Sequence, residues 1–155
     1  MLPFLFWIHL IGMSIWVGAS FLMPLVIGPA LQGIDGPARM KAMAAISQRL
    51  SPIVFGAILL VFLSGIEQTR RIYGFEYLFA SLNALNIKII VAVLMFANGT
   101  YMGVVLPKRG AALAPEPGQP PSPKFLRVMR LTVMHGWIQF GLAIIVLLLV
   151  GFLIS

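Results

Sequence analysis

Four long apolar stretches, separated by short polar segments, dominate the pattern of this 155-residue chain. They cover about residues 3–27, 51–69, 81–106 and 127–154, and each approaches or exceeds the roughly 20 residues that a helix needs to cross a bilayer core. Backbone groups in hydrocarbon must bond to one another, so these stretches predict helices. We therefore expect an all-α integral membrane protein, with residues 1–155 forming one four-transmembrane-helix bundle.

The polar segments carry signals that predict where the helices begin and end. The segment between the first two spans, residues 28–50, contains a turn signal at 35–37, followed by apolar residues at helical spacing among basic ones. That pattern is typical of a short interfacial helix. Ser51 is expected to cap the second span, with Pro52 at its first helical position. Pro107 is expected to end the third span.

Composition and charge narrow the class of protein further. The chain is 60% hydrophobic and only 10% charged, with a net charge of +7. The basic residues fall between the apolar stretches, where they meet lipid headgroups, so the bilayer rather than nucleic acid is the expected partner. Without cysteine, the chain has no disulfide, iron–sulfur cluster or covalently attached c-type haem.

The distribution of basic residues also predicts an orientation. Eight of them lie in or beside the first and third polar segments, and two, Arg70 and Arg71, lie in the second. The positive-inside rule then places the first and third segments in the cytoplasm and both termini outside. The expected location is the bacterial inner (plasma) membrane.

Two ionisable residues inside the spans point to a cofactor, ion or proton site. His9 lies in the first span and Lys88 in the third, at about the same depth, and an ionisable side chain in hydrocarbon costs roughly 2.5 kcal/mol or more. His135, in the fourth span, lies about 18 Å deeper, by a rise of about 1.5 Å per residue. One haem bound by both histidines is therefore not expected.

The order of residues in the first three spans resembles that of the CopD-type copper-resistance membrane proteins. In that family a histidine is followed seven positions later by Trp and then glycine, as His9 is here by Trp16, Val17 and Gly18. Further matches are Arg49-Leu50-Ser51, Ser64-Gly65-Ile66, Tyr73-Gly74, Lys88 and Asn98. The chain is also similar to the HemJ-type membrane protoporphyrinogen oxidases, which carry a histidine early in the first helix and a lysine in the third.

The resemblance implies b-type haem held by His9 and Lys88 and, if the protein is an enzyme, a haem-dependent membrane oxidoreductase of the protoporphyrinogen-oxidase type. Lys88 would be an axial ligand, a proton donor or a cation paired with a propionate, or would instead reach the outer interface along its stem. His135 would bind a second haem or bond to Asn98. Arg70 and Arg71 would hold propionates, or anchor the helix beside Glu67. Trp16 would stack on the macrocycle.

Three functions follow as hypotheses. The first is electron transfer or haem handling, with haem near the outer face between the first and third spans. The second is Cu(I) transport or resistance along soft ligands, namely His9, Met13, Met23, Met95 and Met102. The third is a structural subunit of a membrane respiratory complex, and a homo-oligomer is also compatible with the sequence. Hydrolase and transferase chemistry lacks the carboxylate pairs, triads and phosphate loops that it would need.

Overall fold

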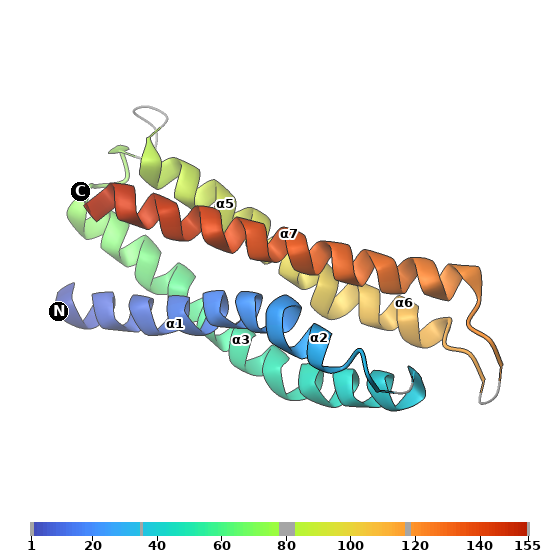
Figure 1. Cartoon of the computed structure of the whole chain (residues 1–155). Coiled ribbons are helices and arrows are strands. Elements are labelled where there is room, and N and C mark those ends of the chain that lie inside the picture. The colour runs from blue at the N-terminus through green and yellow to red at the C-terminus, as the bar shows by residue number, and fades with distance from the viewer. Residues whose placement is uncertain (1, 35, 78–82, 117–118, 155) are drawn as a thin grey trace.

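The chain folds into long helices that run side by side (Figure 1). The computed structural model describes residues 2–34, 36–77, 83–116 and 119–154. Within these ranges helices are the only regular elements, and four are long and apolar enough to span a membrane: Leu2–Ala30, Ala38–Ile72, Ala84–Ala112 and Pro123–Gly151. The expected all-α four-helix membrane protein is confirmed.

The first and third spans are each built from three consecutive helical pieces. In the first, α1 (Leu2–Leu22) continues through a π-helical turn, η1 (Met23–Ile27), into α2 (Gly28–Ala30). In the third, α5 (Ala84–Thr100) continues through η2 (Tyr101–Val105) into α6 (Leu106–Ala112). The third span therefore extends through Pro107, and the expectation that this proline ends it is wrong.

Each π turn ends two residues before a proline. Gly28, before Pro29, donates its N–H to the carbonyl of Met23, and Leu106, before Pro107, donates to Tyr101. A proline ring collides with the carbonyl four residues back in a regular α-helix. The π turn widens the backbone at that point, which lets the helix continue past the proline.

The second span belongs to one long helix, α3 (Gly36–Ile72). The segment expected to form a separate interfacial helix is its N-terminal part, and Ser51 and Pro52 lie inside it rather than at a helix start. The physical reason is that a broken helix in an apolar environment leaves several backbone groups unpaired, which costs more than the one hydrogen bond that Pro52 removes. Asp35, part of the expected turn, lies outside the described residues.

The four spans run up and down, so the connections fall at two ends of the bundle. Both chain termini lie at the end where α3 leads toward α5, and the connections α2–α3 and α6–α7 lie at the other (Figure 1). The last helix, α7 (Pro123–Ile154), begins after the irregular segment that follows α6. We call these the terminal end and the loop end. Eight of the eleven basic residues are at the loop end.

The helices form two closely packed pairs, α1 with α3 and α5 with α7. The pairs meet mainly where α1 touches α7, and Phe62 of α3 also lies 6.0 Å from Phe96 of α5, ring centre to ring centre. Consequently, α1 and α5 lie across the bundle from each other. The buried core receives two residues from every span: Trp16, Val17, Ile58, Val61, Val91, Met95, Ala143 and Val146. Large apolar side chains such as Leu63 and Leu148 cover the outside.

The close approach of α1 to α3 at Gly12 suggests the first test. A Cβ added to Gly12 would lie 2.9 Å from the Ala57 carbonyl oxygen and 2.9 Å from Val61 Cγ2, whereas a Cβ on Gly18 would meet nothing within 4 Å. We expect Gly12→Ala to lower the free energy of unfolding by about 1–3 kcal/mol, because the α1–α3 pair must separate to admit the methyl group. Gly18→Ala should leave it unchanged or slightly raise it. Reversible unfolding in mixed detergent micelles measures both, and equal effects would contradict the assigned interface.

Candidate functional site

The imidazole of His9 lies between α1 and α3. Its Nδ1 is 3.1 Å from the Val61 carbonyl oxygen and 3.0 Å from Ser64 Oγ. The ring also fits against Gly65, where an added Cβ would lie 3.2 Å from His9 Cε1. A larger residue at position 65 would therefore push the imidazole away from α3.

These contacts determine which ring nitrogen carries the proton. A carbonyl oxygen only accepts, so His9 Nδ1 must donate to Val61. The Ser64 hydroxyl donates to the Leu60 carbonyl and is therefore able to accept from His9. In the neutral ring the lone pair is then on Nε2, for which the described residues provide no hydrogen-bond partner. Such a carbonyl-held imidazole is the usual state of a histidine that ligates a metal.

Lys88 approaches this site from α5, across the bundle. It is half-buried, and its charge lies within electrostatic range of the His9 ring. His9 and Lys88 each stand seven residues before a core residue, Trp16 and Met95, on spans that run in the same direction. Both therefore lie about 10 Å from the core layer, toward the terminal end. Within the described part of the chain, the Lys88 ammonium has no hydrogen-bond or ion-pair partner.

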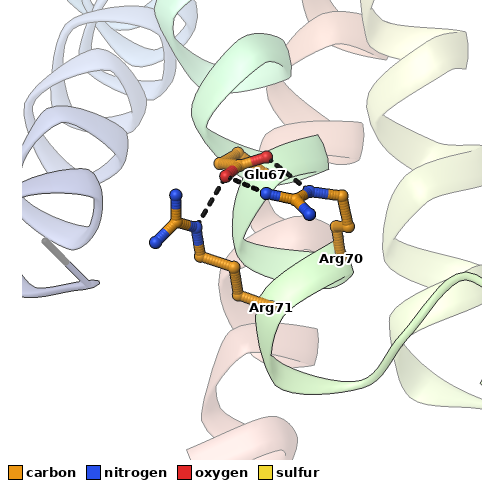
Figure 2. Close-up of polar contacts among 3 residues, drawn as sticks. All are labelled: Glu67, Arg70 and Arg71. Carbon is orange, nitrogen blue, oxygen red and sulfur yellow. Dashed lines mark hydrogen bonds and ion pairs between the residues drawn. The ribbon is translucent and has the colours of Figure 1, made fainter.

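The two arginines of the expected site form a separate group at the end of α3 (Figure 2). Arg70 donates to both carboxylate oxygens of Glu67, at 2.8 and 2.6 Å, and Arg71 Nε donates to Glu67 Oε1 at 2.6 Å. The spacing is that of neighbouring turns, as the sequence suggested for a simple helix anchor. Both guanidinium groups retain further N–H groups that could bind an anion.

The second histidine belongs to a polar network between α5 and α7. Asn98 Nδ2 donates to the His135 carbonyl at 3.0 Å and to Gln139 Oε1 at 2.9 Å, while Asn98 Oδ1 lies 2.6 Å from His135 Nδ1. The expected bond between His135 and Asn98 is therefore present. With its amide nitrogen committed to two acceptors, Asn98 can only accept from the ring, so Nδ1 of His135 also carries the proton. The ring lies 4.9 Å from that of Tyr101.

The histidines occupy different places in the bundle. His9 bonds to α3 on the terminal side of the core, whereas His135 bonds to α5, eight residues from buried Ala143 on the loop side. At about 1.5 Å per residue, the core layer keeps the two rings on the order of 20 Å apart along the bundle. No contact links them.

Other residues of the expected site are part of the packing. Trp16 is 2% exposed and its ring lies 6.1 Å from that of Phe62. Met95 is 1% exposed and fills the same core. Within the described residues, no three histidine or acidic side chains are grouped as metal ligands commonly are.

Sequence reasoning missed the face of α3 that receives His9. Val61 stands three residues before Ser64 and four before Gly65, and Gln68 follows these two at the same spacings, so all four share one face. Gln68 Nε2 donates to the Leu5 carbonyl of α1 at 3.1 Å. Ser64 and Gln68 are polar residues one turn apart in an apolar helix. That spacing was the available signal, because such residues generally face a partner helix.

Comparisons with protein-family models, curated proteins and solved structures found no match for this chain. The resemblance to CopD-type and HemJ-type proteins therefore receives no support from them. The class of protein that the fold defines is a four-helix integral membrane protein, and its function has to be argued from the residues.

The Asn98 network provides the second test. We expect Asn98→Ala to lower the free energy of unfolding by about 1–2 kcal/mol, because it leaves the His135 ring N–H, the His135 carbonyl and Gln139 without their partner. Thr132→Val is the control, since the Thr132 hydroxyl bonds only within α7, to the Val128 carbonyl. Unfolding in mixed micelles gives both values. If the control cost as much as Asn98→Ala, the network would have no special role in joining α5 to α7.

Proposed function

We propose that this protein is a membrane b-type haem-binding protein, in which His9 ligates the iron near the terminal end and the haem supports electron transfer or haem handling. The observation that carries the proposal is the placement of two groups at one depth: the His9 ring, whose Nδ1 is held by the Val61 carbonyl while Nε2 keeps its lone pair, and the Lys88 ammonium, which has no ion-pair partner among the described residues. Haem iron takes an axial imidazole in this state, and the bound iron would supply the one-electron chemistry.

Lys88 and the packing of the helices support the same assignment. The half-buried Lys88 ammonium lies within electrostatic range of His9, and it has no ion-pair partner among the described residues. A haem carries two propionates, either of which would provide the missing negative charge. Lys88 would either pair with a propionate or, as a neutral amine, provide the second axial ligand. The spans α1 and α5 face each other across the bundle, which would let one flat ligand reach both side chains.

Copper transport has weaker support. The proposed series of soft ligands needs Met95, but this side chain is enclosed in the core beside residues from all four spans. Buried methionines of this kind commonly serve packing. A structural subunit role rests on the apolar exterior alone, which lipid would cover equally well.

The haem assignment is tested on the purified protein after reconstitution with haem. We expect a Soret band that shifts on reduction, a positive pyridine haemochrome assay and loss of most of the haem in His9→Ala, since the iron loses its axial ligand. His135→Ala is the matched control and should retain the haem bound at His9. Folded wild-type protein that binds no haem would contradict the proposal, and copper without haem would favour the transport alternative.

One further variant separates the two roles of Lys88. Lys88→Arg keeps the positive charge, but its guanidinium does not ligate iron. Retained haem with an unchanged spectrum would indicate pairing with a propionate. Retained haem with a spectrum typical of a changed coordination state would indicate ligation.

We further propose that the terminal end faces outward from a bacterial inner membrane. Eight basic residues at the loop end support this, since cytoplasmic segments carry the excess of Lys and Arg. Alkaline phosphatase fused after residue 155 should therefore be active, whereas a fusion in the segment between α6 and α7 should be inactive. The reverse pattern would invert the orientation and place the His9 site on the cytoplasmic side.

A further inference from the structure

The loop end of the bundle carries two adjoining open grooves along α7 that the haem proposal does not use. One, of about 710 Å³, lies between α6 and α7, and the other, of about 500 Å³, lies beside it. Arg127 and Leu131 line both grooves, so they form the ridge between them. The volumes are those of typical small-molecule sites.

The lining combines cations with apolar surface. The larger groove is lined by Arg109, Lys124 and Arg127 together with apolar or aromatic residues, namely Tyr101, Ala112, Leu113, Val128 and Leu131. The smaller groove adds Arg130 beside Leu126 and Met134. Among the described residues, none of these four cations makes an ion pair, because the salt bridges found there all involve Glu67 at the opposite end.

The position of the cations on α7 costs stability rather than adding to it. The first turn of this helix has no acidic residue and carries Lys124, with Arg127 following. Positive side chains near a helix N-terminus repel the positive end of the helix dipole. Ser122 Oγ accepts from the Phe125 N–H, which caps the start of α7, and Gly110 of α6 packs near Val128 of α7. These contacts hold the two helices that line the larger groove together. An anionic ligand would offset the repulsion.

From this combination we propose that the paired grooves are a binding site for an anionic phospholipid. Its phosphate would bind Arg127 with Arg109 and Lys124, and its acyl chains would lie over Val128 and Leu131. Unpaired cations above an apolar wall complement a lipid with a charged headgroup, and basic pockets between transmembrane helices commonly have this role. A free phosphate would use the cations but would leave the apolar wall uncovered. The site is independent of the His9 haem site.

The test uses the full-length protein, stripped of co-purified lipid in detergent and observed by native mass spectrometry. It is titrated with phosphatidylglycerol and with phosphatidylcholine of the same acyl chains. We expect at least tenfold tighter binding of phosphatidylglycerol. Equal binding of the two lipids would overturn the proposal.

Matched variants locate the site. Arg127→Gln should weaken phosphatidylglycerol binding about tenfold, because it removes charge-assisted hydrogen bonds to the phosphate. Arg39→Gln removes the same exposed charge at the same end of the bundle but from α3, outside the grooves, and should change the affinity less than twofold. Equal losses in both variants would mean that general surface charge, and not the groove, attracts the lipid, which would overturn the proposal.

Two additions keep the result decisive. Circular dichroism shows whether Arg127→Gln folds. If it does not, the affinity of Lys124→Gln for phosphatidylglycerol is measured instead, and an unchanged affinity would overturn the proposal. Inorganic phosphate is also added to the lipid complex, against sodium chloride of equal ionic strength. Displacement by phosphate alone would identify a site for free phosphate and overturn the assignment to lipid.

Discussion

The absence of water along the four spans is the constraint on which the rest of this structure depends. Lipid is as apolar as leucine, so the hydrophobic effect does little to choose which helix faces meet, whereas a polar group left without a partner is costly. Within the described residues, no buried side-chain nitrogen or oxygen lacks a partner. The bonds that satisfy them join particular helices: His9 to Ser64 and Gln68 to Leu5 connect α1 with α3, and Asn98 to Gln139 connects α5 with α7.

The same constraint explains the shape of the helices. Pro52 stands inside α3, and Pro29 and Pro107 follow π turns inside the first and third spans. In water, a proline generally ends or sharply bends a helix, since the freed carbonyl can bond to solvent. In hydrocarbon no solvent is available, so the backbone adjusts locally and continues. The two π turns also shift the register of α2 and α6 relative to α1 and α5, which a count of 3.6 residues per turn does not anticipate.

Sequence reasoning succeeded where one strong physical signal acts alone and failed where signals compete. The four spans and the two levels of the histidines followed from hydropathy and helix rise. The breaks expected at Ser51 and Pro107 were wrong because cap and proline statistics describe soluble helices. The Val61 contact was missed because it is made by a backbone carbonyl, which every residue possesses and no sequence pattern marks. Trp16 was expected to stack on a macrocycle and Met95 to serve as a soft copper ligand, although such residues also fill cores.

His9 and His135 show why hydrogen bonding alone does not identify a cofactor ligand. In both rings Nδ1 donates, so both leave a lone pair on Nε2, and on this criterion they are equivalent. Charge distinguishes them. The Lys88 ammonium lies within electrostatic range of the His9 ring. His135, in contrast, bonds to the neutral amide of Asn98 and packs on Tyr101. The cations nearest to His135 along α7 line the outer grooves. A haem brings two carboxylates into the membrane, and burying them without a cation is prohibitive. The neutral network is complete as a helix contact, whereas the His9 ring lies within range of a half-buried ammonium that makes no ion pair among the described residues.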